Sequence, residues 1–154
     1  MTIDPIRCDV RVPGAPALAF ARFVELSSWW PMAYSRSGAR FAGAYVEPQV
    51  GGRWYEKDQD GQESPWGDVR AYEPGHRLVM GFNIRPDQGV EPPERQSEVE
   101  VTFTADGGDT IVALEHRDLD KHAEGAASVA TGMGSIHGWP LVLATFERAL
   151  REQA

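Results

Sequence analysis

The order of its hydrophobic patterns constrains the fold of this chain more than any other feature. Apolar and polar residues alternate at residues 6–12 and again at 97–104, which is the period-two pattern of strands that bury one face. Near the C-terminus the apolar spacing changes to three and four, which predicts one apolar stripe along a long helix. The stripe consists of Met133, Ile136, Trp139, Leu143, Phe146 and Leu150.

Short turns join the elements between these two patterns. A helix is predicted at residues 17–24, and the sequence SSWWP after it ends this helix or begins a second short one. Asp60-Gly61 is a strong hairpin signal. Pro140 has no N–H to donate, so it must lie in the first turn of the last helix or kink it. The other predicted segments are strands at 40–46, 53–57, 64–72, 77–84 and 110–118, an exposed proline-rich loop at 85–96 and an irregular segment at 119–129.

A seven-stranded antiparallel sheet of this kind must bury one face, and the last helix offers the large apolar surface that it needs. We therefore expect an α+β fold in which a bent sheet wraps around the C-terminal helix and encloses a space. A chain of 154 residues is the usual size of one domain, so residues 1–154 are predicted to form a single one.

Composition argues against several classes of partner. The formal net charge is −8, the pI is near 4.9 and only two lysines are present, so neither nucleic acid nor an anionic membrane surface is an expected partner. No apolar run approaches the roughly 20 residues that span a bilayer. The N-terminal sequence MTIDPIRCDV has neither the basic nor the apolar region of a secretory signal, which predicts a cytoplasmic protein.

Residues that often carry metal, phosphate or nucleophile chemistry form no known motif in this chain. The single cysteine, Cys8, excludes an intramolecular disulfide and is predicted to be a small buried hydrophobe. The glycines at 51–52 lead into a strand and lack the Lys-Ser/Thr ending of a phosphate loop, so they predict a turn. The spacing of His116, His122 and His137 fits no zinc pattern. We therefore expect neither a metal nor a cofactor.

The aromatic residues and one histidine point more clearly to a function. Five tryptophans supply large apolar area and N–H donors, which suit a flat or greasy ligand, although they would also serve to fill a core. His116 continues an alternating apolar set and should point inward, while its neighbour Glu115 points to the opposite face. An inward histidine suits acid–base chemistry, but a structural role, with a hydrogen bond to the backbone, is the favoured interpretation.

Several sequence motifs together indicate a family. The runs FVELSSWWP, VGGRWYEKDQDGQESPWGDV, EPGHRLV and HGWPLVLATFERAL occur in an order that resembles the START-like (SRPBCC) superfamily. Within it, the chain is most similar to the family of the activator of heat-shock-protein-90 ATPase. The resemblance implies the helix-grip fold, a seven-stranded antiparallel sheet wrapped around a long C-terminal helix, with two short helices after the first strand. It also implies a deep pocket between sheet and helix.

The resemblance leaves three functions open. The first is binding of a small hydrophobic or aromatic ligand in the cavity. The second is a cyclase- or dehydratase-type enzyme, in which His116 or a pocket acid moves a proton on a polyketide-like substrate. The third is a module that interacts with a chaperone or another protein, and a homodimer is a further expected state. The residues expected to bind the ligand are Trp30, Trp54, Trp66, Met80, Phe82, Phe103, His116, Met133 and Trp139.

Overall fold

The computed structural model describes residues 3–31, 34–35, 37–84 and 90–153. Its strands and helices alternate with short turns, in nearly the order that the sequence predicts. They are β1 (Ile6–Pro13), α1 (Pro16–Val24), β2 (Phe41–Val46), β3 (Arg53–Asp58), β4 (Glu63–Glu73), β5 (Arg77–Phe82), β6 (Ser97–Asp106), β7 (Asp109–Arg117), α2 (Ala126–Gly134) and α3 (Trp139–Gln153). Short 3₁₀ turns occupy Leu26–Ser28, Gly38–Arg40, Pro93–Arg95 and Leu119–Gly125.

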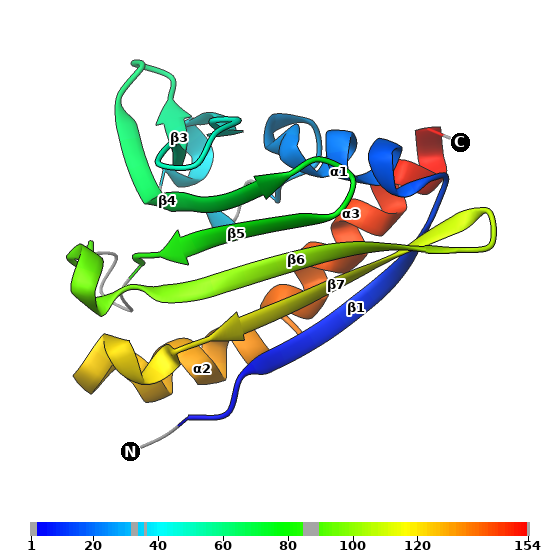
Figure 1. Cartoon of the computed structure of the whole chain (residues 1–154). Coiled ribbons are helices and arrows are strands. Elements are labelled where there is room, and N and C mark those ends of the chain that lie inside the picture. Colours follow the sequence, from blue (N-terminus) through cyan, green and yellow to red (C-terminus); the bar gives the residue numbers. More distant parts are fainter. Residues whose placement is uncertain (1–2, 32–33, 36, 85–89, 154) are drawn as a thin grey trace.

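The seven strands form one antiparallel sheet in the order β1-β7-β6-β5-β4-β3-β2. Figure 1 shows this sheet curving over α3, which lies against one of its faces. The pairing register shifts between Trp54 and Tyr55 on β3 and between Val69 and Ala71 on β4. Such bulges bend a strand, and they allow the sheet to curl around a helix. The predicted α+β helix-grip architecture is confirmed.

The core lies between the sheet and α3. On β6 the alternation is complete, because Val99, Val101 and Phe103 are buried while the residues between them face the other way. The buried residues of α3 recur at helical spacing and complete the opposite wall of the core. They are Trp139, Val142, Leu143, Phe146 and Leu150.

The apolar stripe near the C-terminus is divided between two helices. Gly138 separates α2 from α3, and a Cβ at this position would meet the carbonyl oxygen of Met133 at 2.2 Å, so the tight turn requires glycine. Ile136 lies in this turn with 77% of its surface exposed, so its assignment to the buried stripe is wrong. Pro140 lies in the first turn of α3, as predicted.

Two segments that were predicted to be irregular contain buried side chains. Within 85–96, Glu91 and Gln96 are only 3% and 7% exposed, so the expectation of an exposed loop is wrong for them; residues 85–89 lie outside the described residues. The segment 119–129 forms a 3₁₀ turn and the start of α2, and it buries His122. Prolines and charges predicted an exposed loop at 85–96 and small, charged residues predicted an irregular segment at 119–129, but tertiary contacts bury part of each.

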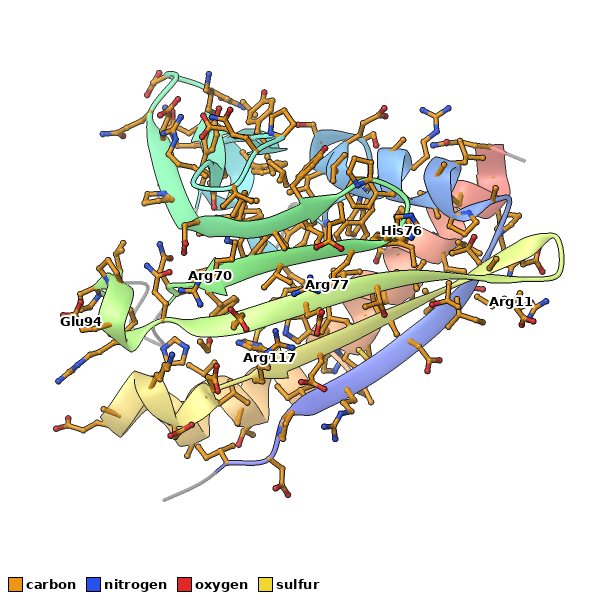
Figure 2. The ribbon with its side chains drawn as sticks, viewed as in Figure 1. Arg11, Arg70, His76, Arg77, Glu94 and Arg117 are labelled. Carbon is orange, nitrogen blue, oxygen red and sulfur yellow. The ribbon has the colours of Figure 1, made fainter. Side chains whose placement is uncertain are left out.

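The face of the sheet turned away from α3 carries a network of charges. Figure 2 shows Arg70, Arg77 and Arg117, which come from β4, β5 and β7, on this face. Arg117 lies 2.6 Å from a carboxylate oxygen of Glu98 and 2.6 Å from one of Glu100, which also pairs with Arg77. Since these cations are matched by carboxylates, the network ties β4 to β7 across the outer face.

Candidate functional site

A cavity of about 340 Å³ lies between the sheet and the junction of α2 with α3. Strands β3, β4 and β5 supply one wall, the segment after the Leu26–Ser28 turn supplies a second, and α2 and α3 supply the third. Among the described residues of the lining, none is an aspartate, glutamate, lysine or arginine. The lining consists of Trp30, Tyr34, Ser35, Trp54, Trp66, Phe82, Ile84, Gly132, Met133, His137, Gly138, Trp139 and Val142.

Aromatic rings dominate this lining and pack against one another. Trp66 lies at the centre, with its ring centroid 4.9 Å from that of Trp30 and 5.2 Å from that of Trp54. Trp139 lies on the other side, 6.5 Å from Trp30 and 6.2 Å from Phe82. Four indoles and a phenyl ring thus present apolar faces to one small volume, which is the composition of a site for a flat apolar molecule.

The structure brings six of the nine predicted ligand residues to the cavity and places three elsewhere. Met80, Phe103 and His116 are buried and do not belong to the cavity lining. Phe103 packs in the core instead, with its ring 5.2 Å from that of Phe20 and 5.7 Å from that of Phe23. The six that line the cavity are Trp30, Trp54, Trp66, Phe82, Met133 and Trp139.

Sequence reasoning missed several lining residues, and a signal existed for two of them. Val142 lies one helical turn after Trp139, and Ile84 continues the alternation from Phe82, so both follow from periodicity. Tyr34 lies in a 3₁₀ turn and Ser35 in a bend, which are too short for a period to indicate which side chains face inward.

A buried carboxylate holds the central tryptophan. Glu56 on β3 is fully buried, and its Oε1 accepts a hydrogen bond of 2.8 Å from the indole N–H of Trp66. Its Oε2 accepts bonds from the backbone N–H of Ser37, at 2.9 Å, and from the hydroxyl of the same residue. Trp54, Tyr55 and Glu56 are consecutive buried residues, which strict alternation would not predict, and the register with β4 shifts at this point because Trp66 is an extra residue on β4.

A second buried polar chain holds Trp139. Its indole N–H donates to Nδ1 of His116 at 2.9 Å, and Nε2 of His116 lies 2.7 Å from the hydroxyl oxygen of Ser97. The same hydroxyl lies 2.6 Å from Nε2 of His122. Beyond it, Nδ1 of His122 is 3.5 Å from Oε1 of Glu91, which is long for a hydrogen bond.

The donor chemistry of this hydrogen-bonded network fixes the tautomer of His116. An indole N–H can only donate, so Nδ1 of His116 accepts and its proton is on Nε2, which donates to Ser97. The Ser97 hydroxyl donates to Nε2 of His122 when the proton of a neutral His122 is on Nδ1, facing Glu91, and accepts from Nε2 when that nitrogen carries the proton.

Burial keeps these histidines neutral at physiological pH. Desolvation, followed by the nearby His122, lowers the pKa of His116 from 6.5 to about 3. Desolvation also lowers the pKa of His122, while the neighbouring Glu91 carboxylate opposes that change. His116 was expected to point inward, and it is fully buried, but it lies behind Trp139 and outside the cavity lining.

Two general properties of the described residues complete the picture. They contain no cluster of three or more histidine, cysteine, aspartate or glutamate side chains that could hold a metal ion. Within the same ranges, no helix combines the length and apolar character that crossing a membrane requires.

A curved antiparallel sheet closed over a C-terminal helix, with an aromatic cavity between them, defines a helix-grip protein of the START-like (SRPBCC) class. The sequence places the chain more narrowly. It belongs to the family of activator of Hsp90 ATPase homolog 1-like proteins, whose sequence model matches residues 19–151. The resemblance inferred from the motifs is confirmed.

Solved structures of similar proteins share the fold over nearly their whole length. The anthrahydroquino-γ-pyrone synthase Txn09 is 33% identical, covers 96% of this chain and 97% of its own, and has a TM-score of 0.66. The self-sacrificing resistance protein CalC from Micromonospora echinospora is 31% identical, covers 97% of this chain and 96% of its own, and has a TM-score of 0.66. The Aha1 dimer from Colwellia psychrerythraea is 14% identical with 96% of each chain covered and a TM-score of 0.64, which supports the fold alone. None of the curated proteins matches this chain.

Proposed function

We propose that this protein binds a small hydrophobic or aromatic molecule in the cavity between β3–β5 and α3. The observation that carries the proposal is the wall of aromatic rings, in which Trp30 is in ring contact with both Trp66 and Trp139 around one volume of about 340 Å³. This volume lies within the range of small-molecule sites. Rings packed at a wall bury a flat ligand on several sides with little loss of side-chain entropy.

The relatives support an aromatic ligand. By its name, Txn09 synthesises an anthrahydroquino-γ-pyrone, a product with fused rings, and it is 33% identical to this chain. Identity at this level over nearly the whole chain supports a related class of small molecule here, although fold alone does not determine function.

Tryptophan fluorescence tests the proposal, since four native tryptophans line the cavity. The protein is titrated with a panel of fatty acids, flavonoids, fused-ring aromatics and sterols. We expect saturable quenching by the fused-ring class. Replacing Val142→Phe fills part of the cavity from the wall of α3 and should weaken that binding at least tenfold.

The matched control lies one residue away on the same helix. Leu141 is 38% exposed and does not line the cavity, so Leu141→Phe should leave the affinity unchanged. Absence of quenching by every class, in a protein with a cooperative unfolding transition, would contradict the proposal. Equal weakening by both variants would place the binding site elsewhere.

A second candidate function is turnover of such a ligand by a cyclase- or dehydratase-type reaction, favoured by the similarity to Txn09. His116 has both ring nitrogens engaged, so a proton-transfer role passes to the titratable side chains of the lining, Tyr34 and His137. Product formation from a poly-β-keto substrate analogue, lost in Tyr34→Phe or His137→Gln with binding retained, would support this function. If the protein only binds the ligand, neither the unmodified protein nor the two variants would form product.

Protein partners remain a separate prediction. Interaction with a chaperone or with a second copy of the chain rests on family membership, and the Colwellia relative is named as a dimer. Sedimentation of the protein alone and with the chaperone would test both.

A further inference from the structure

The five indole N–H groups of this chain differ in one respect. Four donate to a protein acceptor, and the fifth, on Trp30, is buried and has no partner among the described residues. The four paired indoles are Trp29, to the carbonyl oxygen of Phe23 at 3.0 Å; Trp54, to that of Gly81 at 2.6 Å; Trp66, to Glu56 at 2.8 Å; and Trp139, to His116 at 2.9 Å.

Backbone bonding and ring packing, without a hydrogen bond from the indole, hold Trp30 in place. Its backbone N–H donates to the carbonyl oxygen of Leu26 at 2.8 Å, which fixes the start of the side chain. Its ring then packs 4.9 Å from Trp66 and 6.5 Å from Trp139. A buried indole N–H normally finds an acceptor, so an unpaired one in a cavity wall calls for an acceptor from outside the chain.

We propose that the indole N–H of Trp30 is the specificity-determining donor of this cavity. The ligand is then a planar fused-ring molecule with an uncharged oxygen acceptor, a carbonyl or quinone oxygen, at its edge. This inference rests on the proposed function, since it assigns the ligand class of the same cavity.

The charges of the lining favour an uncharged acceptor. Among the described lining residues there is no arginine or lysine to neutralise a carboxylate, and the buried Glu56 behind Trp66 would repel one. A charge moved into such a site without a partner is strongly disfavoured, whereas a carbonyl needs only one donor. Of the four indoles in the lining, those of Trp54, Trp66 and Trp139 already have acceptors, which leaves Trp30 as the indole donor for such an oxygen.

A matched pair of probes tests the donor. Fluorenone and fluorene share one planar tricyclic frame and differ in a carbonyl against a methylene group, and equilibrium dialysis measures both on the same scale. We expect the unmodified protein to bind fluorenone about fivefold more tightly than fluorene, the effect of one net hydrogen bond. In Trp30→Phe this preference should disappear or invert, because the carbonyl of fluorenone then gives up its hydrogen bonds to water on binding and gains no donor in the cavity.

The control is Trp29→Phe, which shortens a ring outside the cavity lining whose N–H is already paired with the carbonyl of Phe23, and it should keep the preference. Should Trp30→Phe fail to fold, the same position carrying benzothienylalanine keeps the bicyclic shape and replaces N–H with sulfur, with the same expected loss. Equal binding of both probes to the unmodified protein, or an unchanged preference in the Trp30 variants, overturns the inference while the proposed function stands. Binding of neither probe overturns both.

Discussion

Two tryptophans face the same cavity, and they are held in opposite ways. Trp139 on α3 donates into a buried chain that runs through His116, Ser97 and His122 toward Glu91. Trp30 lies 6.5 Å away, and its N–H has no acceptor among the described residues. One side of the cavity is thus fixed by polar contacts with the protein, and the other has its polar group left for a ligand.

The difference shows how a small aromatic cavity is kept open and selective at once. Rings that contribute only surface are anchored from behind, so that they do not collapse into the space. The ring that contributes a hydrogen bond to the ligand is fixed by packing alone, which leaves its donor unused. The comparison of Trp139 with Trp30 therefore separates residues that shape the cavity from the residue that selects its occupant.

The largest expected effect comes from removing the middle of the anchor. His116→Ala leaves a cavity and deprives both Ser97 and the Trp139 indole of a partner. We expect the free energy of unfolding to fall by about 3–4 kcal/mol, measured by urea denaturation. The adjacent Glu115→Ala, on the outer face of the same strand, should cost less than about 1 kcal/mol. Similar losses from the two would show that the buried chain is not an anchor.

A direct test compares the same substitution on the two sides. Trp139→Phe leaves Nδ1 of His116 buried without its donor, so stability should fall by about 2–3 kcal/mol. Trp30→Phe removes an N–H that had no protein partner, and the loss should stay near 1 kcal/mol, due to the smaller ring alone. Thermal and urea unfolding of the two variants measure the difference. If Trp30→Phe is as costly as Trp139→Phe, the two sides are equivalent and the comparison fails.

Lowering the pH should reduce the stability that the buried His116 contributes on the Trp139 side of the cavity. The unfolded chain binds a proton at His116 near pH 6.5, and the folded chain does so only near pH 3, so the unfolded state holds more protons between these values. Stability from this residue is therefore full above pH 6.5 and declines as pH falls through that window, by about 2 kcal/mol between pH 7 and pH 5. His116→Gln removes the titrating group and should flatten this part of the stability profile. Parallel profiles of stability against pH for the unmodified protein and His116→Gln would contradict the assignment of this pH dependence to His116.

The smallest effect is expected on the outer face of the sheet. Arg117→Ala breaks ion pairs with Glu98 and Glu100, but the side chain is 25% exposed and water screens the pairs. We expect a loss of about 1 kcal/mol, an unchanged affinity for fluorenone, and a weaker effect at high salt. Arg7, with 69% of its side chain exposed, is the control, because Arg7→Ala should change almost nothing. A reduced affinity for fluorenone in Arg117→Ala would mean that the outer face of the sheet influences ligand binding in the cavity.

Local patterns were sufficient to predict the architecture. The alternation at Val99, Val101 and Phe103, the Asp60-Gly61 turn and the spacing of Trp139, Leu143 and Phe146 each act over a few residues, and together they require a sheet around a helix. The interruption at Gly138 was not predictable, because the missing space for a Cβ depends on the carbonyl of Met133 in the folded turn.

The site was predictable only in part, for the same reason. The number of tryptophans in the sequence predicted an aromatic binding site, and four of the five line the cavity. The anchor behind them joins Glu91, Ser97, His116, His122 and Trp139, which come from separate elements, so no spacing in the sequence links them. The sequence analysis considered His122 only as a possible zinc ligand for that reason, and the unpaired donor of Trp30 is a property of the packed structure.

The most direct test of the central claim observes the indole N–H groups themselves. In a ¹⁵N-labelled protein the five tryptophans give five indole N–H resonances, and Trp30→Phe identifies the resonance of Trp30 by its loss. On titration with fluorenone we predict that the Trp30 resonance shifts most, as expected when a free donor acquires an acceptor, while the resonance of Trp29 outside the cavity lining stays in place. A Trp30 resonance that does not move at saturating fluorenone would contradict the account.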